Sequence, residues 1–254
     1  MTTIKHLFKF FILVLVSELA LAQVDNTTEI KALSKIFKEQ ISTITHNQNY
    51  IDWVITDTIN KISTSVYRDR AQYFVYVDRN PQAQNIMVGF FQSDKNKITI
   101  IGWDKVSTGN PQRKGHFITP TGVFINSMTN LGYRAEGTKN SKGWRGLGRK
   151  NSRVWDFGWQ KTPHRNEERE IRLLLHATDP DFGEPRLGGV DSKGCVRISA
   201  KLNYFLDHYS ILDNEYEKYV ASGNHSWLLA KDRETVKAPG LIMIVGDSTV
   251  TIED

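Results

Sequence analysis

A single cysteine, Cys195, is the sequence feature that most limits how this chain of 254 residues is stabilised. Without a second thiol the chain cannot form an internal disulfide, so its fold must depend on a hydrophobic core. A chain of this length buries enough apolar surface for one domain with a sizeable core and a small appendage. Cys195 is therefore either a packing residue or a nucleophile, and its neighbours in D-S-K-G-C-V-R-I favour a nucleophile.

The N-terminus has the pattern of an export signal. Lys5 and Lys9 precede an uninterrupted apolar run at residues 10–16, and A-L-A at residues 20–22 offers small side chains to a signal peptidase. The apolar run is far shorter than the roughly 20 residues that span a bilayer. We therefore expect residues 1–22 to be a cleaved signal peptide, with a periplasmic location and no stable membrane span.

The charge of the chain narrows the class of partner. The formal net charge is +5, and removing the signal would leave the protein basic. A basic exported protein suits anionic polymers such as the cell wall, and export disfavours a nucleic-acid partner.

Hydrophobic periodicity predicts a mainly β (α+β) domain with flanking helices. Apolar residues from Ile30 to Ile62 recur at three- and four-residue steps, which indicates two amphipathic helices that either lie against the main domain or act as a spacer. After Tyr73 the pattern becomes typical of strands separated by turns. Strands are expected at 72–78, 85–92, 97–105, 123–125, 171–175 and 241–245, and a helix at 199–220.

These elements give a domain plan. We expect a helical N-terminal segment at 23–70, a catalytic domain at 71–246 with a helical insertion at about 200–238, and a tail at 247–254. Residues 132–158 hold six glycines and seven Lys or Arg against two acidic residues, which predicts an exposed, basic, flexible rim.

Two ordered motifs carry the chemistry. His176 is followed by fifteen residues and then by S-K-G-C-V-R at residues 192–197, and the segment S-T-G-N-P-Q-R-K-G-H-F-I-T-P-T-G-V-F occupies residues 107–124. Together they resemble the signature of the L,D-transpeptidase catalytic domain, the YkuD-like family, over roughly residues 73–199. Lys193 stands where many members carry a second histidine.

The resemblance implies a YkuD-like β-sandwich and peptidoglycan L,D-transpeptidation. Cys195 would attack the stem peptide at its third residue, release the terminal D-alanine, and hold the stem as a thioester. The acceptor amine would belong to another stem, to a free D-amino acid or to a lipoprotein lysine. No metal or cofactor is expected, and the family implies acylation by carbapenems. The alternatives are an L,D-carboxypeptidase that uses water, and a non-catalytic cell-wall-binding module.

The residues themselves support thiol chemistry. Attack requires a thiolate, and we expect an ion pair with His176 to lower the pKa of Cys195. His176 would accept the proton and later return it to the leaving amine. We expect N–H groups around Gly194 and Cys195 to stabilise the oxyanion, with Ser192, Ala177 and Thr178 in support.

Other side chains are candidates for substrate contact. Arg197 is placed to hold a substrate carboxylate or to brace the loop. Trp155 and Trp159 are candidates for stacking, although large aromatics are more often core or loop anchors. Lys193 and His116 complete the substrate-binding set, although a structural role is the commoner one for such a histidine. The histidines show no spacing typical of zinc ligands.

Overall fold

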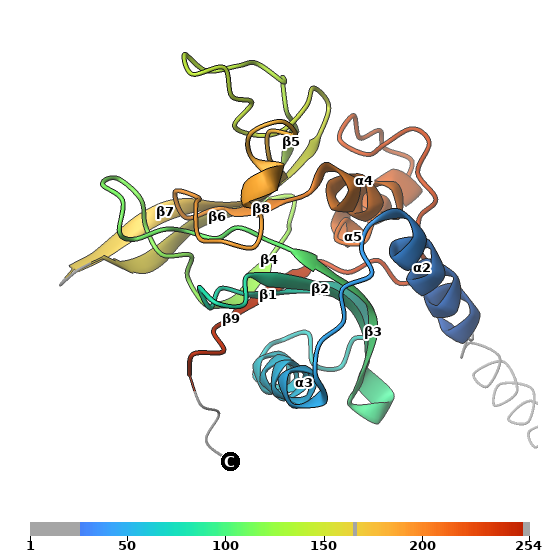
Figure 1. Cartoon of the computed structure of the whole chain (residues 1–254). Coiled ribbons are helices and arrows are strands. Elements are labelled where there is room, and N and C mark those ends of the chain that lie inside the picture. Colours follow the sequence, from blue (N-terminus) through green and yellow to red (C-terminus); the bar gives the residue numbers. More distant parts are fainter. Residues whose placement is uncertain (1–25, 165–166, 251–254) are drawn as a thin grey trace, which may run out of the picture.

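The structure is a computed structural model that describes residues 26–164 and 167–250. It is a mixed α+β fold, mostly β, with two sheets and four α-helices among these residues (Figure 1). The predicted signal peptide and the last four residues of the predicted tail lie outside the described residues. The part of the chain that is described contains no helix long and apolar enough to cross a bilayer.

The first sheet has five strands in the order β3-β2-β1-β9-β4, and the second has four in the order β5-β6-β7-β8. Most neighbours are antiparallel, but β1 pairs with β9 and β7 pairs with β8 in parallel. The strands are β1 (Gln72–Asp78), β2 (Asn85–Gln92), β3 (Lys97–Lys105), β4 (Gly122–Ile125), β5 (Tyr133–Arg134), β6 (Arg153–His164), β7 (Glu167–Ala177), β8 (Val196–Ile198) and β9 (Ile242–Gly246). The six predicted strands are therefore present, with ends displaced by a few residues at most in β4, β7 and β9.

One hydrophobic core joins the two sheets. Alternate residues of β1, such as Val75, and of β7, such as Leu173 and Leu175, are buried in the same cluster. The opposite face of the first sheet, which includes Phe74 and Tyr76, forms a second cluster with α3. Burial on both faces explains why β1 and β2 are almost continuously apolar.

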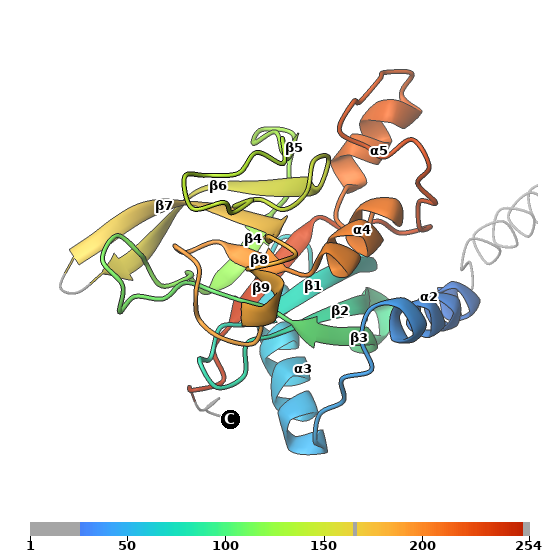
Figure 2. The same cartoon turned by 45° about the horizontal axis from the view of Figure 1, so that its top comes forward.

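The two N-terminal helices lie against the domain. Helix α2 (Asn26–Gln40) inserts Phe37 into the central core, where its ring meets that of Phe205 edge-on at 5.3 Å. Helix α3 (Gln48–Ser63) is capped by the side chain of Asn47 and covers the outer face of the first sheet (Figure 2). Of the two alternatives left open by the sequence, the structure therefore shows packing rather than a free spacer.

The predicted helix at 199–220 is wrong in one respect, because it is broken. Helix α4 (Ala200–His208) ends before Ser210, whose φ of +51° is left-handed, and α5 (Asn214–Ala221) begins after a buried turn. Apolar spacing continues through the break because Ile211 and Leu212 also face the core. The remainder of the predicted helical insertion, up to residue 238, has no α-helix.

The predicted loop at 132–158 is also partly wrong, because β6 begins at Arg153. This arginine is fully buried and pairs with Asp213, at 3.0 Å between Nη2 and Oδ1. The sequence indicated an exposed Arg153 because the side chain is charged, but the buried Asp213 carboxylate compensates this charge. Short helical turns at Ser93–Lys95 and Glu184–Arg186 complete the described elements.

Candidate active site

His176 lies on β7, and Cys195 lies immediately before β8, the parallel neighbour of β7 in the second sheet. His176 is near the end of β7, where it pairs with Arg197 of β8, and Cys195 directly precedes β8. Leu175 and Val196 point into the core, so His176 and Arg197 occupy the opposite face of the sheet. Cys195 precedes Val196 and belongs to that same face by alternation. The fifteen-residue spacing in the sequence therefore becomes the loop that returns the chain to the parallel neighbour of β7.

The two sequence motifs form one unit. The amide of Ser192 donates to the Thr108 carbonyl at 2.9 Å, and the Thr119 hydroxyl donates to the Gly194 carbonyl at 2.8 Å. Phe117 donates its amide to the Lys193 carbonyl at 3.2 Å. Gly109 packs so closely against this loop that a Cβ on it would lie 1.9 Å from the Phe117 carbonyl oxygen and 3.0 Å from the Cα of Gly194. The S-T-G…T-P segment is therefore the frame that holds the cysteine loop.

The loop geometry changes one expectation for the oxyanion site. The buried Ser192 hydroxyl donates to the Cys195 carbonyl at 2.5 Å and accepts the Gly194 N–H at 3.0 Å. The Gly194 amide is thus already used, contrary to the prediction that it points at an oxyanion. The Cys195 amide has no hydrogen-bond partner within residues 26–164 and 167–250, and it remains the donor available to substrate. Gly194 itself has φ of +132°, which few other residues adopt.

His176 is held in one tautomer. Its side chain is buried, and Nδ1 lies 2.6 Å from the Ala177 carbonyl oxygen. A carbonyl only accepts, so Nδ1 carries the proton and Nε2 keeps its lone pair. Burial lowers the pKa of His176 to about 4, and the positive charge of Arg197 acts in the same direction. At neutral pH the imidazole is therefore a neutral base.

The Cys195 thiol is half-buried, with Sγ 3.7 Å from the Arg172 carbonyl oxygen. Burial raises the pKa of Cys195 above its ordinary value, although the Leu174 amide and the Arg197 charge partly oppose this effect. The expected resting ion pair with His176 is therefore wrong. Both groups are neutral at rest, and the thiol must lose its proton to His176 as it attacks.

This charge state has a measurable consequence. Because the thiol pKa is raised, iodoacetamide should alkylate Cys195 more slowly than it alkylates N-acetylcysteine at pH 6, and the rate should climb without a plateau above pH 9. Intact-mass spectrometry over a pH series measures the rate, and the Cys195→Ala protein gives the background. A fast, pH-independent rate below pH 7 would instead show a preformed thiolate.

An arginine cluster lies beside the pair. The Asp191 carboxylate forms ion pairs with three arginine side chains. Arg113 binds Oδ1, while Arg186 and Arg197 lie 3.5 and 3.2 Å from Oδ2. One carboxylate cannot neutralise three guanidinium groups, so this cluster keeps an excess positive charge. Arg197 is 20% exposed and braces the loop, whereas Arg113 and Arg186 are about half exposed, at 51% and 47%. The sequence indicated only Arg197, because the other two are distant in the chain.

The remaining predicted residues separate into two groups. Trp155 is fully buried and donates Nε1–H to Asp213 at 3.2 Å, so it is a core anchor, and its predicted substrate role is wrong. Trp159 is 63% exposed, with the Arg172 guanidinium 6.0 Å from its ring centre. The carbonyl of this same Arg172 lies 3.7 Å from Sγ of Cys195, so Trp159 lies near the cysteine.

The other predicted residues surround the cysteine loop. Half-buried His116 places Nδ1 2.9 Å from the Ser192 carbonyl, and Lys193 is exposed. Thr178 is buried, and its amide donates a hydrogen bond to the Ile198 carbonyl at 3.2 Å. The Ala177 carbonyl accepts the hydrogen bond from Nδ1 of His176. These residues therefore support or border the site.

Tyr133 was not found from the sequence. This half-buried residue of β5 is electrostatically coupled to Cys195, Asp156 and Arg172. Burial and the nearby Asp156 carboxylate raise the pKa of Tyr133, so its hydroxyl stays protonated and can donate. A two-residue strand with no motif gave no sequence signal for it.

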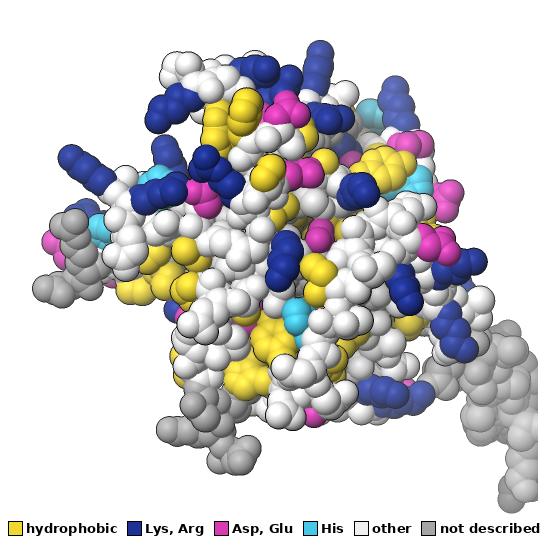
Figure 3. Space-filling view, in the orientation of Figure 1, with side chains coloured by type: hydrophobic (Ala, Val, Ile, Leu, Met, Phe, Trp, Pro, Cys, Tyr) yellow, Lys and Arg dark blue, Asp and Glu magenta, His cyan; other side chains and the backbone are white. Residues whose placement is uncertain are grey.

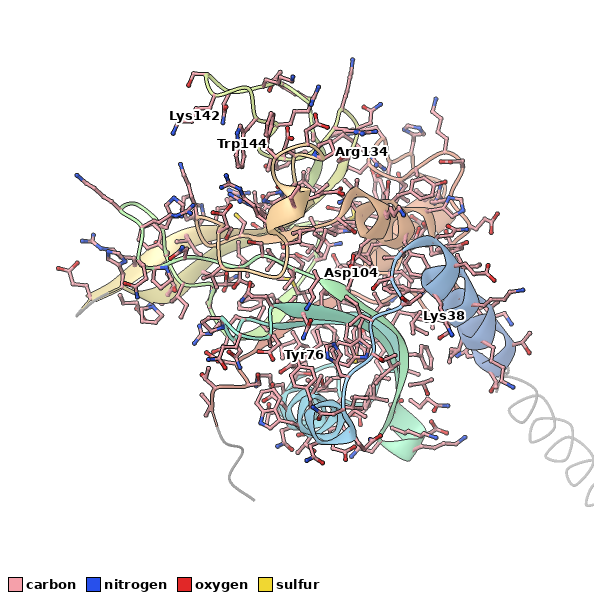
Figure 4. The ribbon with its side chains drawn as sticks, viewed as in Figure 1. Lys38, Tyr76, Asp104, Arg134, Lys142 and Trp144 are labelled. Atoms are coloured by element: carbon pink, nitrogen blue, oxygen red, sulfur yellow. The ribbon has the colours of Figure 1, made fainter. Side chains whose placement is uncertain are left out.

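The basic rim is fastened over the second sheet. Figure 4 shows Trp144 and Lys142 on the segment after β5, and Trp144 stacks on Phe182 at 5.8 Å while Arg186 lies 4.5 Å over the Trp144 ring. Arg145 donates its amide to Asp179 at 2.8 Å, and a Cβ on Gly148 would lie 2.7 Å from that of Ala177. Lys and Arg side chains stand out over this segment in Figure 3. The rim is basic as predicted, but these contacts attach it next to His176.

Within the described ranges, no cluster of three or more His, Cys, Asp or Glu side chains could hold a metal ion.

No protein-family model and no curated protein matches the sequence. Among solved structures, the chain is similar to that described as "Structure of Bdellovibrio bacteriovorus Bd1075", with 17% identity and a TM-score of 0.32. The alignment covers 70% of this chain and 48% of that one, so it spans about half of that protein. At this TM-score the likeness carries no argument.

Proposed function

We propose that the protein is a cysteine acyltransferase, a periplasmic peptidoglycan L,D-transpeptidase of the YkuD-like type. The observation that carries the proposal is the position of Cys195 at the start of β8, beside the strand β7 on which a neutral His176 is fixed in one tautomer. The second sequence motif frames this loop through its hydrogen bonds. The two packed sheets are compatible with a YkuD-like sandwich.

The reaction follows from these groups. As Sγ of Cys195 bonds to the carbonyl carbon of the third stem residue, Nε2 of His176 takes the thiol proton. The oxyanion accepts the Cys195 N–H. The bond to the terminal D-alanine then breaks, and the imidazolium gives its proton to the departing amine. An acceptor amine attacks the thioester, His176 takes its proton, and the thiol is regenerated.

The arginine cluster supports a substrate rich in carboxylates. Stem peptides carry such groups near the bond to be broken, and guanidinium groups bind carboxylates in a bidentate manner. Arg113 and Arg186 have the exposure required for contact, and Arg197 holds Asp191 in place. Trp159 adds an exposed ring, and the guanidinium beside it belongs to Arg172, whose carbonyl lies near Sγ of Cys195.

Removing charge from this cluster should weaken substrate capture. The Arg113→Gln/Arg186→Gln protein is expected to have a KM for soluble tetrapeptide fragments raised roughly threefold to tenfold, with kcat little changed. Steady-state kinetics measure this, and Lys35→Gln/Lys38→Gln on α2 is the control, because it removes the same charge from exposed positions elsewhere. A fall in kcat with KM intact would show that the cluster builds the catalytic geometry instead.

Product analysis tests the function. Purified muropeptide tetrapeptides are incubated with the protein, and mass spectrometry identifies the products. A 3-3 cross-linked dimer, or incorporation of an added D-amino acid or a lipoprotein lysine peptide, supports transpeptidation. A tripeptide as sole product would show water as acceptor, hence an L,D-carboxypeptidase. Binding to peptidoglycan with no product under any of these conditions would indicate the non-catalytic wall-binding module and overturn the proposal.

A further inference from the structure

A hollow lies away from Cys195. It has a volume of about 620 Å³ and is formed where the end of the rim, α4 and the segment after α5 come together. Its lining includes Arg134, Lys150, Asn151, Tyr204, Trp227 and Lys231. None of the residues assigned to the Cys195 site lines it. Figure 4 shows Arg134 at this end of the second sheet, next to α4.

Two exposed aromatic rings line this hollow. Trp227 is 64% exposed and Tyr204 is 53% exposed, although side chains of this size contribute most to a protein when buried. The Tyr204 ring is held in place by stacking on His208 at 5.2 Å, and its hydroxyl lies 3.5 Å from Asp232. Figure 3 shows an exposed hydrophobic patch beside a histidine over α4. Ordered, exposed aromatic faces beside a hollow indicate a binding surface.

The polar groups around the rings are of two kinds. The floor is an ion pair in which Arg134 binds Asp207 through two contacts, of 2.5 and 3.0 Å, and both side chains are largely buried. The edge is different. Exposed Lys150 and Lys231 form no ion pair with any described residue, and the side-chain amide of Asn151 has no hydrogen bond to one. The charges of the floor are therefore paired, whereas the edge offers the side-chain amide of Asn151 and the two ammonium groups of Lys150 and Lys231 to a ligand.

We propose that this hollow binds an oligosaccharide that carries carboxylate groups. A pyranose ring has an apolar face of C–H groups, which matches the electron-rich face of an aromatic ring, and a polar edge that matches an amide. The two lysines match carboxylates, which neutral saccharides lack. This binding is separate from the chemistry of Cys195, and it gives the segment after α5 a role in holding the glycan part of a wall polymer.

The test uses the full chain with Cys195→Ala, so that turnover does not affect the result. Isothermal calorimetry measures binding of peptide-free glycan strands released by an amidase, whose muramic acid residues carry free carboxylates, and of chitotetraose, which is uncharged. We expect the charged glycan to bind more tightly, and added salt to weaken only its binding. Trp227→Ala should lower the affinity at least tenfold for both.

Matched variants separate this hollow from the Cys195 site. Trp159→Ala removes a ring of equal exposure, 63% against 64%, and should leave glycan binding unchanged. Lys150→Gln/Lys231→Gln should reduce the affinity for charged glycan to that for chitotetraose. Tyr204→Ala serves as a second ring variant should Trp227→Ala fail to fold. Equal binding by the parent and both ring variants, or no binding of either saccharide at millimolar concentration, would overturn the proposal.

Discussion

Replacing Cys195 with alanine or serine is expected to abolish product formation, with a loss of roughly 10⁴-fold or more in kcat/KM. Alanine removes the only atom able to form the thioester, and a serine hydroxyl is too weakly acidic for a neutral imidazole to activate as readily as a thiol. Muropeptide turnover measured by mass spectrometry gives the rate. Because the side chain is half-buried and small, the thermal midpoint should change little.

His176→Ala is the companion variant. It should be equally inactive, because the thiol then has no base, yet its Cys195 should still be alkylated slowly at high pH, where the thiol ionises unaided. Near wild-type turnover by Cys195→Ala would remove the thiol from the mechanism. Unchanged turnover by His176→Ala would assign the base to another residue.

The largest stability effect is expected at Asp213. Its fully buried carboxylate accepts Arg153 at 3.0 Å, Trp155 at 3.2 Å and Asn126 at 3.2 Å. Asp213→Ala leaves the buried Arg153 guanidinium without its counter-charge, which should cost about 3–5 kcal/mol in the free energy of unfolding. The thermal midpoint should then fall by on the order of 10 °C.

Two controls define this result. Glu39→Ala breaks an exposed pair with Lys35 and should leave the thermal midpoint almost unchanged. Arg153→Met/Asp213→Ala should be more stable than Asp213→Ala alone, because the uncompensated charge is then absent. Equal midpoints for Asp213→Ala and wild type in calorimetry would show that the network does not support the junction between β6 and α4–α5.

Local patterns were sufficient for much of the fold. Apolar periodicity located α2, α3 and the three strands β1 to β3, because each of these elements buries a continuous face. It failed where tertiary contacts override local composition. The charge of Arg153 concealed the start of β6, since only Asp213, distant in sequence, makes its burial possible. The break at Ser210 was concealed because Leu212 still faces the core.

The candidate site divides in the same way. Motif spacing identified Cys195 and His176, and the structure places His176 on β7 and Cys195 immediately before the neighbouring strand β8. Spacing carries no information on burial, so the direction of the Cys195 pKa shift was predicted wrongly, and the lowered pKa of His176 was not predicted. Trp155 and Trp159 are both aromatic and four residues apart, yet one is buried and one exposed. A register shift in β6 lies between them, and no sequence pattern reports it.

The central claim is that Cys195 carries the stem peptide as a thioester. The direct measurement is intact-mass spectrometry of the protein quenched in acid within seconds of mixing with a tetrapeptide muropeptide, followed by peptide mapping. We expect one adduct with the mass of the donor less its terminal D-alanine, located on the peptide that contains Cys195, and none in Cys195→Ala. An adduct on another residue, or product formation with no adduct at any time, would contradict the account.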